Sequence, residues 1–301
     1  GITLIAGGGY HGKSTLLNAL ERGVYNHIAG DGREYVITEP SALKLRSEDG
    51  RFIKDVDISL FINDLPNKKD TRCFSTLDAS GSTSQAAGIV EGMEAGTKLL
   101  LLDEDTSATN FMVRDTFMQE VISRDKEPIT PFLERARDLY EKAGISTILV
   151  AGSSGAFFHI ADTVIQMDSY RTLDITEKVK NLCRKYPLSF SHVPAFAMPN
   201  FNRVMTVPPV KGDGYKELKL KVHGKDSFSL GKETIDLRYI EQIVDSEQTA
   251  ALGQLLKYAR EHLLDNKRSL SQVISLLEKT LDEKGLAGIC SSSYIPCGLA
   301  M

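Results

Sequence analysis

Apolar and polar positions in the first 170 residues fall into two alternating kinds of segment. Short, continuous apolar runs occur at residues 2–6, 99–102 and 146–151. Such runs are typical of parallel strands that are buried on both faces. Between these runs, residues 87–96 and 132–140 repeat apolar positions at helical spacing. The alternation predicts an α/β fold in which helices flank a mainly parallel sheet.

The pattern changes near residue 175. Between Pro187 and Pro209 prolines recur among short aromatic and polar runs, which is typical of loops and edge strands. Helical spacing returns at residues 240–264 and 271–284. We therefore predict two parts, an α/β core at residues 1–174 and a mixed β/α region at residues 175–301, in which a basic β-rich segment precedes the helices.

Residues 7–14, GGGYHGKS, fit the phosphate-binding pattern GxxxxGK[ST] and stand between a predicted strand and a predicted helix, as that motif requires. The backbone N–H groups of such a loop form a concave anion site. Lys13 adds a positive charge for the β- and γ-phosphates, and Ser14 offers a hydroxyl to Mg²⁺. The sequence predicts a bound nucleoside triphosphate. The expected nucleotide-binding residues are Gly9, Tyr10, His11, Gly12, Lys13, Ser14 and Thr15.

Two acids, Asp103 and Glu104, directly follow the apolar run at residues 99–102. The C-terminal ends of strands in an open α/β sheet form the edge where ligands bind. We expect Asp103 to hold Mg²⁺ together with Ser14, directly or through water. Glu104 would polarise the attacking water, so we assign it as catalytic together with Lys13.

Residues 79–86, ASGSTSQA, precede a helical pattern that ends just before the strand carrying Asp103. The segment resembles the LSGGQ signature of ABC-class ATPases, with Ser80, Gly81 and Ser82 at the SGG positions. Residues 105–110, DTSATN, resemble that class's PTSALD stretch. With residues 25–34, YNHIAGDGRE, these segments are similar to the stand-alone family of predicted ATPases of the ABC class. The similarity covers most of the chain and is strongest over residues 1–170.

The resemblance implies an ABC-type P-loop NTPase core that binds ATP and hydrolyses it with Mg²⁺. It also implies an ATP-dependent homodimer in which Ser80, Gly81 and Ser82 complete the partner's phosphate site. A γ-phosphate half open to water lacks donors on its outer side, and a second chain would supply them. One alternative is a nucleotide-gated, nucleic-acid-binding switch with little turnover. Another, a small-molecule kinase, is disfavoured because no acceptor pocket or lid is evident in the sequence.

One departure from the ABC pattern follows the strand at residues 146–151. The family continues there into a switch histidine, but the alignment places Gly152 at that position with Ser153 and Ser154 beside it, and His159 is out of register. We assign Ser153 as the catalytic replacement. A hydroxyl can orient water but cannot carry the charge of a histidine, so we expect slow or differently gated hydrolysis.

Two further family features are displaced or missing. The Mg²⁺-facing glutamine that follows an early strand is replaced by Asn63 or Ser59. We take Asn63 as a metal ligand, although an asparagine in a loop is usually a turn former. The chain opens at Gly1, inside the first core strand, so we read it as part of a longer protein. The aromatic residue that stacks on adenine is expected upstream of Gly1.

Composition fits a cytosolic enzyme. Hydrophobic residues make up 42% and charged residues 25% of the chain, as in ordinary globular proteins. No apolar run approaches the roughly 20 residues that span a membrane, and no signal peptide is visible. We therefore expect no membrane partner and a cytoplasmic location, with an organelle as the alternative. The cysteines, expected to be reduced, are Cys73, Cys183, Cys290 and Cys297.

Residues 178–232 carry a net charge of +8, whereas the whole chain carries −4. Basic residues in this segment alternate with apolar ones, which would place a basic row on one face of a strand. A basic surface with aromatic residues is typical of proteins that bind single-stranded RNA or DNA, and members of the resembled family are associated with RNA. The alternative is a solvated face that balances acids elsewhere. The row is Lys219, Lys221, His223 and Lys225, and the aromatic residues are Phe190, Phe196, Phe201 and Tyr215.

Overall fold

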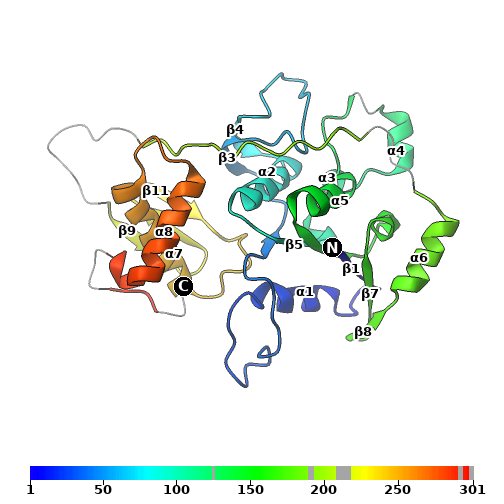
Figure 1. Ribbon diagram of the computed structural model, residues 1–301, viewed down its shortest axis with the longest axis horizontal. Coiled ribbons are helices and arrows are strands. Elements are labelled where there is room, and N and C mark those ends of the chain that lie inside the picture. The colour runs from blue at the N-terminus through cyan, green and yellow to red at the C-terminus, as the bar shows by residue number, and fades with distance from the viewer. Residues whose placement is uncertain (124–125, 189–192, 208–217, 291–293, 298–301) are drawn as a thin grey trace. The chain divides into compact units, whose positions relative to one another are not determined.

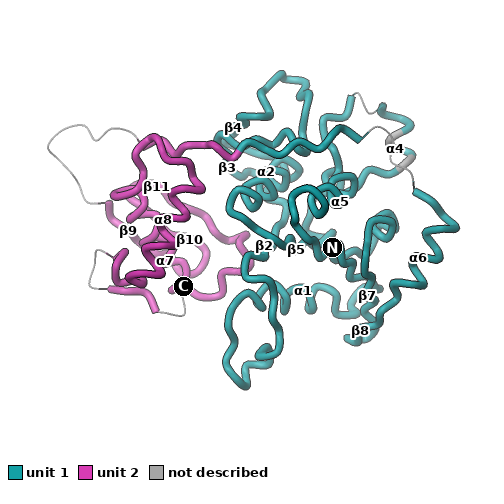
Figure 2. The backbone as a smooth tube through the Cα atoms, in the orientation of Figure 1, with its two compact units in different colours: residues 1–200 teal, residues 201–301 magenta. Residues whose placement is uncertain are grey.

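The computed structural model describes residues 1–301 except 124–125, 189–192, 208–217, 291–293 and 298–301 (Figure 1). The chain divides into two compact units, residues 1–200 and residues 201–301 (Figure 2). Among the described residues, no helix is long and apolar enough to cross a membrane.

A six-stranded sheet forms the centre of the first unit, in the order β2-β5-β6-β1-β7-β8. The first five strands of this order run parallel, and β8 pairs antiparallel with β7 at one edge. This sheet confirms the predicted, mainly parallel architecture. The strands are β1 (Ile2–Ala6), β2 (Leu43–Leu45), β5 (Leu99–Asp103), β6 (Ser146–Ala151), β7 (Thr163–Asp168) and β8 (Arg171–Asp174).

Helices cover both faces of this sheet (Figure 1). On one face, Leu17 of α1 (Lys13–Arg22) packs with Ile5 and Leu101. Neighbouring strand residues point to the opposite face, where α5 (Phe132–Ala143) contacts β1 and β6. Both faces are therefore buried, which explains why the central strands read as continuous apolar runs. Other helices and helical turns in the described part of the unit include α2 (Gly81–Glu94), η1 (Glu104–Thr106), α3 (Thr109–Met112), α4 (Thr116–Val121), η3 (Gly155–His159) and α6 (Thr176–Lys185).

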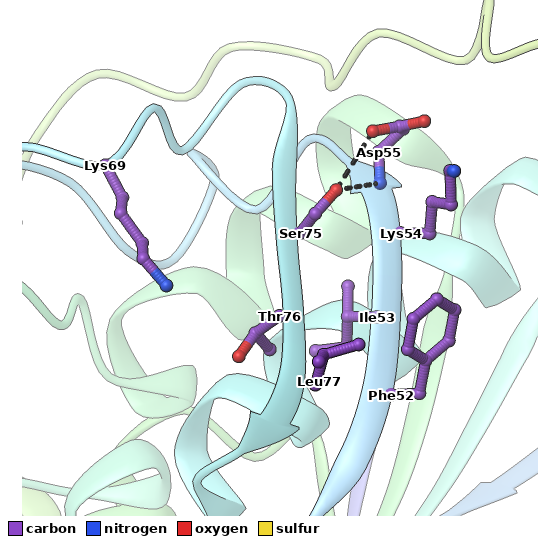
Figure 3. A pocket seen from close by; sticks show the side chains of 8 residues that line it. All are labelled: Phe52, Ile53, Lys54, Asp55, Lys69, Ser75, Thr76 and Leu77. Atoms are coloured by element: carbon purple, nitrogen blue, oxygen red, sulfur yellow. Dashed lines mark hydrogen bonds between the residues drawn. The ribbon is translucent and has the colours of Figure 1, made fainter.

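A separate antiparallel pair, β3 (Arg51–Val56) and β4 (Phe74–Ala79), leads directly into Ser80 and the start of α2. Its outer side carries exposed apolar side chains, Phe52 at 57% and Leu77 at 82% exposure. Figure 3 shows these two side chains beside a surface hollow whose lining includes no residue of the phosphate loop. The pair therefore places Ser80 at the end of an exposed strand.

The first unit extends to Asn200, beyond the change in pattern near residue 175. Arg135 of α5 is 1% exposed and donates hydrogen bonds to the carbonyls of Leu60 (2.9 Å) and Pro194 (2.7 Å). The Asn200 N–H donates to the Asp57 carboxylate at 2.9 Å. These buried polar contacts tie the proline-rich stretch to the core.

The second unit is an antiparallel sheet packed against helices. Strands β9 (Leu220–Val222), β10 (Ser227–Leu230) and β11 (Glu233–Asp236) lie in the order β11-β10-β9. α7 (Ser246–Tyr258) contacts β9 and β10, and α8 (Leu270–Lys284) follows a π-helical turn at Ala259–Leu263. A short helical turn, η5 (Leu286–Gly288), comes after α8. The unit therefore has the mixed strand and helix content that the sequence predicts.

The helix expected from residue 240 begins only at Ser246. Asp245 caps it, accepting a hydrogen bond from the Glu247 N–H at 2.7 Å, while Gln248 accepts from the Asp245 N–H at 3.2 Å. Such a capping box fixes the first residue of a helix. Apolar residues at 240–244 continue the helical spacing by coincidence and lie in the turn before the cap.

Candidate nucleotide site

The loop between β1 and α1 bends at positions where only glycine fits. Gly7 has φ of 149°, and a methyl group on it would lie 2.5 Å from the Met167 carbonyl oxygen. Gly12 has φ of 97° and is the residue before α1. Side chains are strained at such angles. The bends aim the first, unpaired N–H groups of α1 toward the loop, which creates an anion site.

Lys13 lies over this loop. Its Nζ donates to the carbonyl oxygens of Gly7 at 2.9 Å and Gly8 at 2.8 Å. A methyl group on Gly152, at the end of β6, would lie 3.6 Å from the same Nζ. The ammonium therefore stands between the phosphate loop and the end of the neighbouring strand. Charged phosphate oxygens are stronger acceptors than the two neutral carbonyls.

The structure brings together Ser14 and Asp103, which lie 89 positions apart in the sequence. The Ser14 hydroxyl donates to Asp103 Oδ2 at 3.1 Å, and Asp103 is 5% exposed. A hydroxyl and a carboxylate at this spacing fit Mg²⁺, which prefers oxygen ligands and takes its remaining ligands from substrate phosphates and water.

Asn63 has a local hydrogen-bonding role. Its side-chain amide donates to the Ser59 carbonyl at 2.6 Å, and its N–H donates to the Pro128 carbonyl at 2.8 Å. Within the described part of the chain it makes no hydrogen bond to Ser14 or Asp103. Its assignment as a metal ligand stays a prediction.

Glu104 accepts several hydrogen bonds from the segment that follows β6. One carboxylate oxygen accepts from the N–H groups of Gly152 (2.8 Å) and Ser153 (3.0 Å), and the other accepts from the Ser154 N–H (3.1 Å) and the Ser153 hydroxyl. Partial burial raises the pKa of Glu104, but these hydrogen bonds outweigh it and hold the pKa below its ordinary value. Glu104 is therefore a firmly ionised and weakened base.

Glu104, Ser153 and Ser154 also line a cavity of about 560 Å³ in the first unit. The cavity gives the carboxylate an open side, although its oxygens are engaged on the other. Ser153 is thus placed beside Glu104, and its role as the replacement for the switch histidine stays a prediction.

The three signature residues differ in their surroundings. Ser80 is exposed and caps α2, accepting from the Thr83 N–H at 3.4 Å. Ser82 is 6% exposed, and its hydroxyl donates to the Asn110 side chain at 2.6 Å. Gly81 is buried beside Ser47, whose hydroxyl occupies the space a side chain would need. Ser80 is the signature residue that presents a hydroxyl to solvent.

Gln85 is a residue that the sequence did not single out. It is fully buried in α2, donates to the Ser107 hydroxyl at 2.9 Å and accepts from the Ala108 N–H at 3.0 Å. These bonds join the signature helix to the segment that follows Glu104. Its place in ASGSTSQA, next to Ser84, is the only signal in the sequence.

A second set of contacts joins the phosphate loop to the turn between β7 and β8. His11 Nδ1 accepts from the Ser169 N–H at 2.9 Å and lies 3.2 Å from Asp168 Oδ1, while the His11 carbonyl accepts from the Tyr170 N–H at 3.1 Å. Ser169 and Tyr170 have positive φ angles. Such turns usually carry glycine or asparagine, so the residues at 169 and 170 did not indicate this turn. The remaining predicted nucleotide-binding residues, Gly9, Tyr10 and Thr15, are exposed to solvent.

The comparison with protein families agrees with this geometry. A family model described as ABC_ATPase, a P-loop domain, matches residues 1–201. The chain belongs to the ABC_ATPase family. The match confirms the resemblance to ABC-class ATPases, and a further model, the MRB1590 C-terminal domain, matches residues 219–301.

Individual relatives of this ABC_ATPase chain are known. An uncharacterized protein of Methanocaldococcus jannaschii, MJ1628, is 34% identical over 191 residues, which cover 62% of this chain and 41% of the relative. The match thus spans about two fifths of that relative's length. Solved structures of similar proteins include MJ1267, an ATP-binding cassette of an ABC transporter in its ADP conformation (14% identity, TM-score 0.39, 61% of this chain and 84% of that one). Another is cbiO1 from Clostridium perfringens, part of the transporter complex cbiONQ (16%, TM-score 0.40, 61% and 82%).

In this ABC_ATPase chain, Ser153→Ala should raise the pKa of Glu104 toward its ordinary value, because a hydrogen bond to the charged form is lost. If Glu104 acts on water, the acidic limb of the turnover profile will move to higher pH. ATP turnover measured across a pH series, with Ser154→Ala as control, tests this. The Ser154 hydroxyl accepts from Ala156 instead. An acidic limb at the same pH in Ser153→Ala and the unmodified protein would contradict it.

Proposed function

We propose that this protein is a Mg²⁺-dependent ATPase that hydrolyses ATP to ADP and phosphate at the β1–α1 loop. The hydrogen bond between Ser14 and Asp103, with Glu104 as the next residue, is the observation that carries the proposal. It joins α1, which follows the phosphate loop, to the last residue of β5. Family membership supports nucleotide chemistry at this place.

Each residue has a distinct role in the proposed reaction. The N–H groups at the start of α1 bind the β-phosphate, and Lys13 leaves the Gly7 and Gly8 carbonyls to bind the β- and γ-phosphates. Ser14 and Asp103 would hold Mg²⁺, which withdraws charge from the phosphate oxygens when bound. Glu104 orients a water for attack on the γ-phosphorus and accepts its proton as the bond to ADP breaks.

A rival mechanism keeps the same site but uses ATP only as a switch. The switch mechanism is supported by the hydrogen bonds that Glu104 accepts. Residues 152–154 donate to both of its carboxylate oxygens, and these bonds lower the pKa of Glu104. While residues 152–154 hold Glu104 in this way, ATP hydrolysis is slow, and it speeds up only when that segment moves. Measured turnover separates the two mechanisms.

We further propose that two copies form composite ATP sites. Ser80 supports this, because its hydroxyl is exposed at the N-terminus of α2, where the partial positive charge of the helix favours an anion. The hydrogen bonds of Ser82 and Gln85 anchor α2 to the segment after Glu104. Contact of Ser80 with a partner's γ-phosphate would therefore be transmitted through α2 to the segment next to Glu104.

Ser80→Arg should leave ATP affinity of the single chain within about twofold, because Ser80 serves the partner's site. It should abolish ATP-dependent dimers, since a guanidinium side chain fills the space where the γ-phosphate must be enclosed. Light scattering of the Glu104→Gln protein with ATP, with and without Ser80→Arg, measures this. The control is Lys98→Ala, which changes an exposed residue of the same unit. Thr83 is not used because its hydroxyl is hydrogen-bonded to that of Ser80. Dimers that persist in Ser80→Arg would contradict the composite site.

The second unit is proposed to bind single-stranded RNA or DNA. Lys219, Lys221 and His223 are exposed, while Leu220 and Val222 between them are half-buried. α7 lies behind Leu220, because a methyl group on its Gly253 would contact that side chain. The basic residues therefore share the face of β9 that points away from α7.

Hydroxyl groups extend this face across the sheet. Lys221 is paired with Ser229 of β10, which is paired with Thr234 of β11. His223 Nε2 lies 2.8 Å from the Ser229 hydroxyl. Cations beside hydroxyl donors suit a phosphodiester backbone. Lys225 lies in the turn after β9 rather than on the strand, and residues 190 and 211–217, which include Phe190 and Tyr215, lie outside the described residues.

Replacing Lys219, Lys221 and Lys225 by glutamate should weaken oligonucleotide binding with little dependence on base sequence. The slope of log affinity against log salt should flatten by about 2, since each phosphate contact on a single strand contributes roughly −0.7. Fluorescence anisotropy with a labelled oligonucleotide across a salt series measures it. The matched control reverses three exposed lysines of the same unit, Lys267, Lys279 and Lys284. Equal losses in both triple variants would indicate a general charge effect and contradict a site on β9.

A further inference from the structure

Tyr170 lies directly against the phosphate loop. It is in the turn between β7 and β8, and a methyl group on Gly12 would lie 2.7 Å from its Cδ1 and 3.1 Å from its Cε1. The ring therefore contacts Gly12, the residue just before α1. Even so, 69% of Tyr170 remains exposed, and among the described residues its hydroxyl makes no hydrogen bond.

The backbone of Tyr170 is hydrogen-bonded to the phosphate loop. The Tyr170 N–H donates to the His11 carbonyl at 3.1 Å, and the preceding N–H, of Ser169, donates to His11 Nδ1 at 2.9 Å. Two successive donors of the turn thus bind one residue of the phosphate loop. A turn tied in this way keeps Tyr170 beside whatever the loop binds.

Sheet order places Tyr170 on the side of the loop opposite Glu104. β1 lies between β6 and β7 in the sheet. β6 runs into Gly152, whose N–H binds Glu104, so the γ-phosphate end of a nucleotide belongs on the β6 side. β7 ends at Asp168, two residues before Tyr170. A triphosphate that runs along the loop from the β6 side directs its nucleoside toward β7.

We propose that Tyr170 is the stacking platform for the base of the bound nucleotide. An exposed aromatic ring beside an anion site supplies what phosphate contacts cannot, an apolar face that a nucleobase covers. Stacking of a base on an aromatic side chain is favourable because every base has a π-face. The inference rests on the proposed function, because it needs a nucleoside triphosphate in the loop. It assigns the base contact to Tyr170 in place of the aromatic residue expected upstream of Gly1.

Isothermal titration with ATP and with inorganic tripolyphosphate, each with Mg²⁺, separates base contacts from phosphate contacts. Tyr170→Ala and Tyr170→Leu should weaken ATP binding about tenfold while tripolyphosphate binding stays within about twofold. Leucine keeps an apolar contact with Gly12 but offers no π-face. Tyr170→Phe should bind ATP like the unmodified protein. Tyr186→Ala removes a tyrosine of similar exposure, 72%, and should change neither ligand.

Three results would overturn the inference: unchanged ATP affinity in Tyr170→Ala, equal weakening of both ligands, or full affinity in Tyr170→Leu. Tyr10→Ala supplies a direct rival, because Tyr10 is a fully exposed aromatic residue of the loop. A loss specific to ATP in Tyr10→Ala alone would move the platform there. If the unmodified protein binds neither ligand, the proposed function fails as well. If it binds both and Lys13→Ala binds neither, the proposed function stands and the Tyr170 variants decide this inference alone.

Discussion

Replacing Lys13 with alanine is expected to lower the affinity for MgATP by about a hundredfold or more, because hydrogen bonds from a charged group to phosphate are among the strongest in proteins. In the structure Lys13 binds two loop carbonyls, at 2.9 and 2.8 Å. A phosphate would replace both acceptors with charged ones. Titration with a fluorescent ATP analogue measures the loss.

The control for this variant is Lys279→Ala, which removes an exposed lysine of α8 and should leave ATP affinity unchanged. Circular dichroism should show the same fold in both variants. Because the Lys13 bonds to Gly7 and Gly8 also brace the loop, thermal unfolding should be compared as well. Unmodified ATP affinity in a folded Lys13→Ala protein would contradict the phosphate-loop assignment.

Glu104→Gln should keep ATP bound but lower turnover by about two orders of magnitude or more, because an amide cannot accept the proton of the attacking water. The substitution also changes the hydrogen bonds between this side chain and residues 152–154. A glutamine has one acceptor oxygen, so its amide nitrogen will face the Ser154 N–H unless the side chain turns. The Ser153 hydroxyl can adapt, because it can accept as well as donate. ATP affinity and phosphate release should be measured on the same preparation.

Glu141→Gln is the control for this loss. Glu141 lies near the end of α5 with 58% of its side chain exposed. It should hydrolyse ATP at the unmodified rate. Turnover in Glu104→Gln equal to that of the control would remove Glu104 from the mechanism. Loss of ATP binding together with turnover would show that Glu104 shapes the site rather than acting on water.

Much of the first unit could be predicted from local sequence. The apolar runs at residues 2–6 and 99–102 are continuous because helices cover both faces of the sheet. The burial of these two strands could therefore be predicted from their residue types alone. The same reasoning placed Ser14 and Asp103 near each other, since both follow parallel strands at one edge of the sheet. The distance of 3.1 Å between their oxygens agrees with that expectation.

Contacts between distant segments could not be predicted in the same way. His11 and Ser169 are 158 positions apart, and no spacing rule connects a residue of the phosphate loop to a turn without glycine. Ser82 and Asn110 each belong to a recognised segment, but neither segment predicts the hydrogen bond that joins them. The first unit runs past residue 175 because Arg135, buried in α5, binds the Pro194 carbonyl. Proline spacing alone indicates loops and carries no information about which core they pack on.

The measurement that tests the central claim most directly is phosphate release from ATP by the unmodified protein, Lys13→Ala and Glu104→Gln in parallel. Each is assayed with Mg²⁺, with Mg²⁺ removed by a chelator, and with and without a single-stranded oligonucleotide. We predict release by the unmodified protein with Mg²⁺, release near background in both variants, and ATP retained only by Glu104→Gln. Background release by the unmodified protein in every condition, or equal release by all three proteins, would contradict hydrolysis at this site.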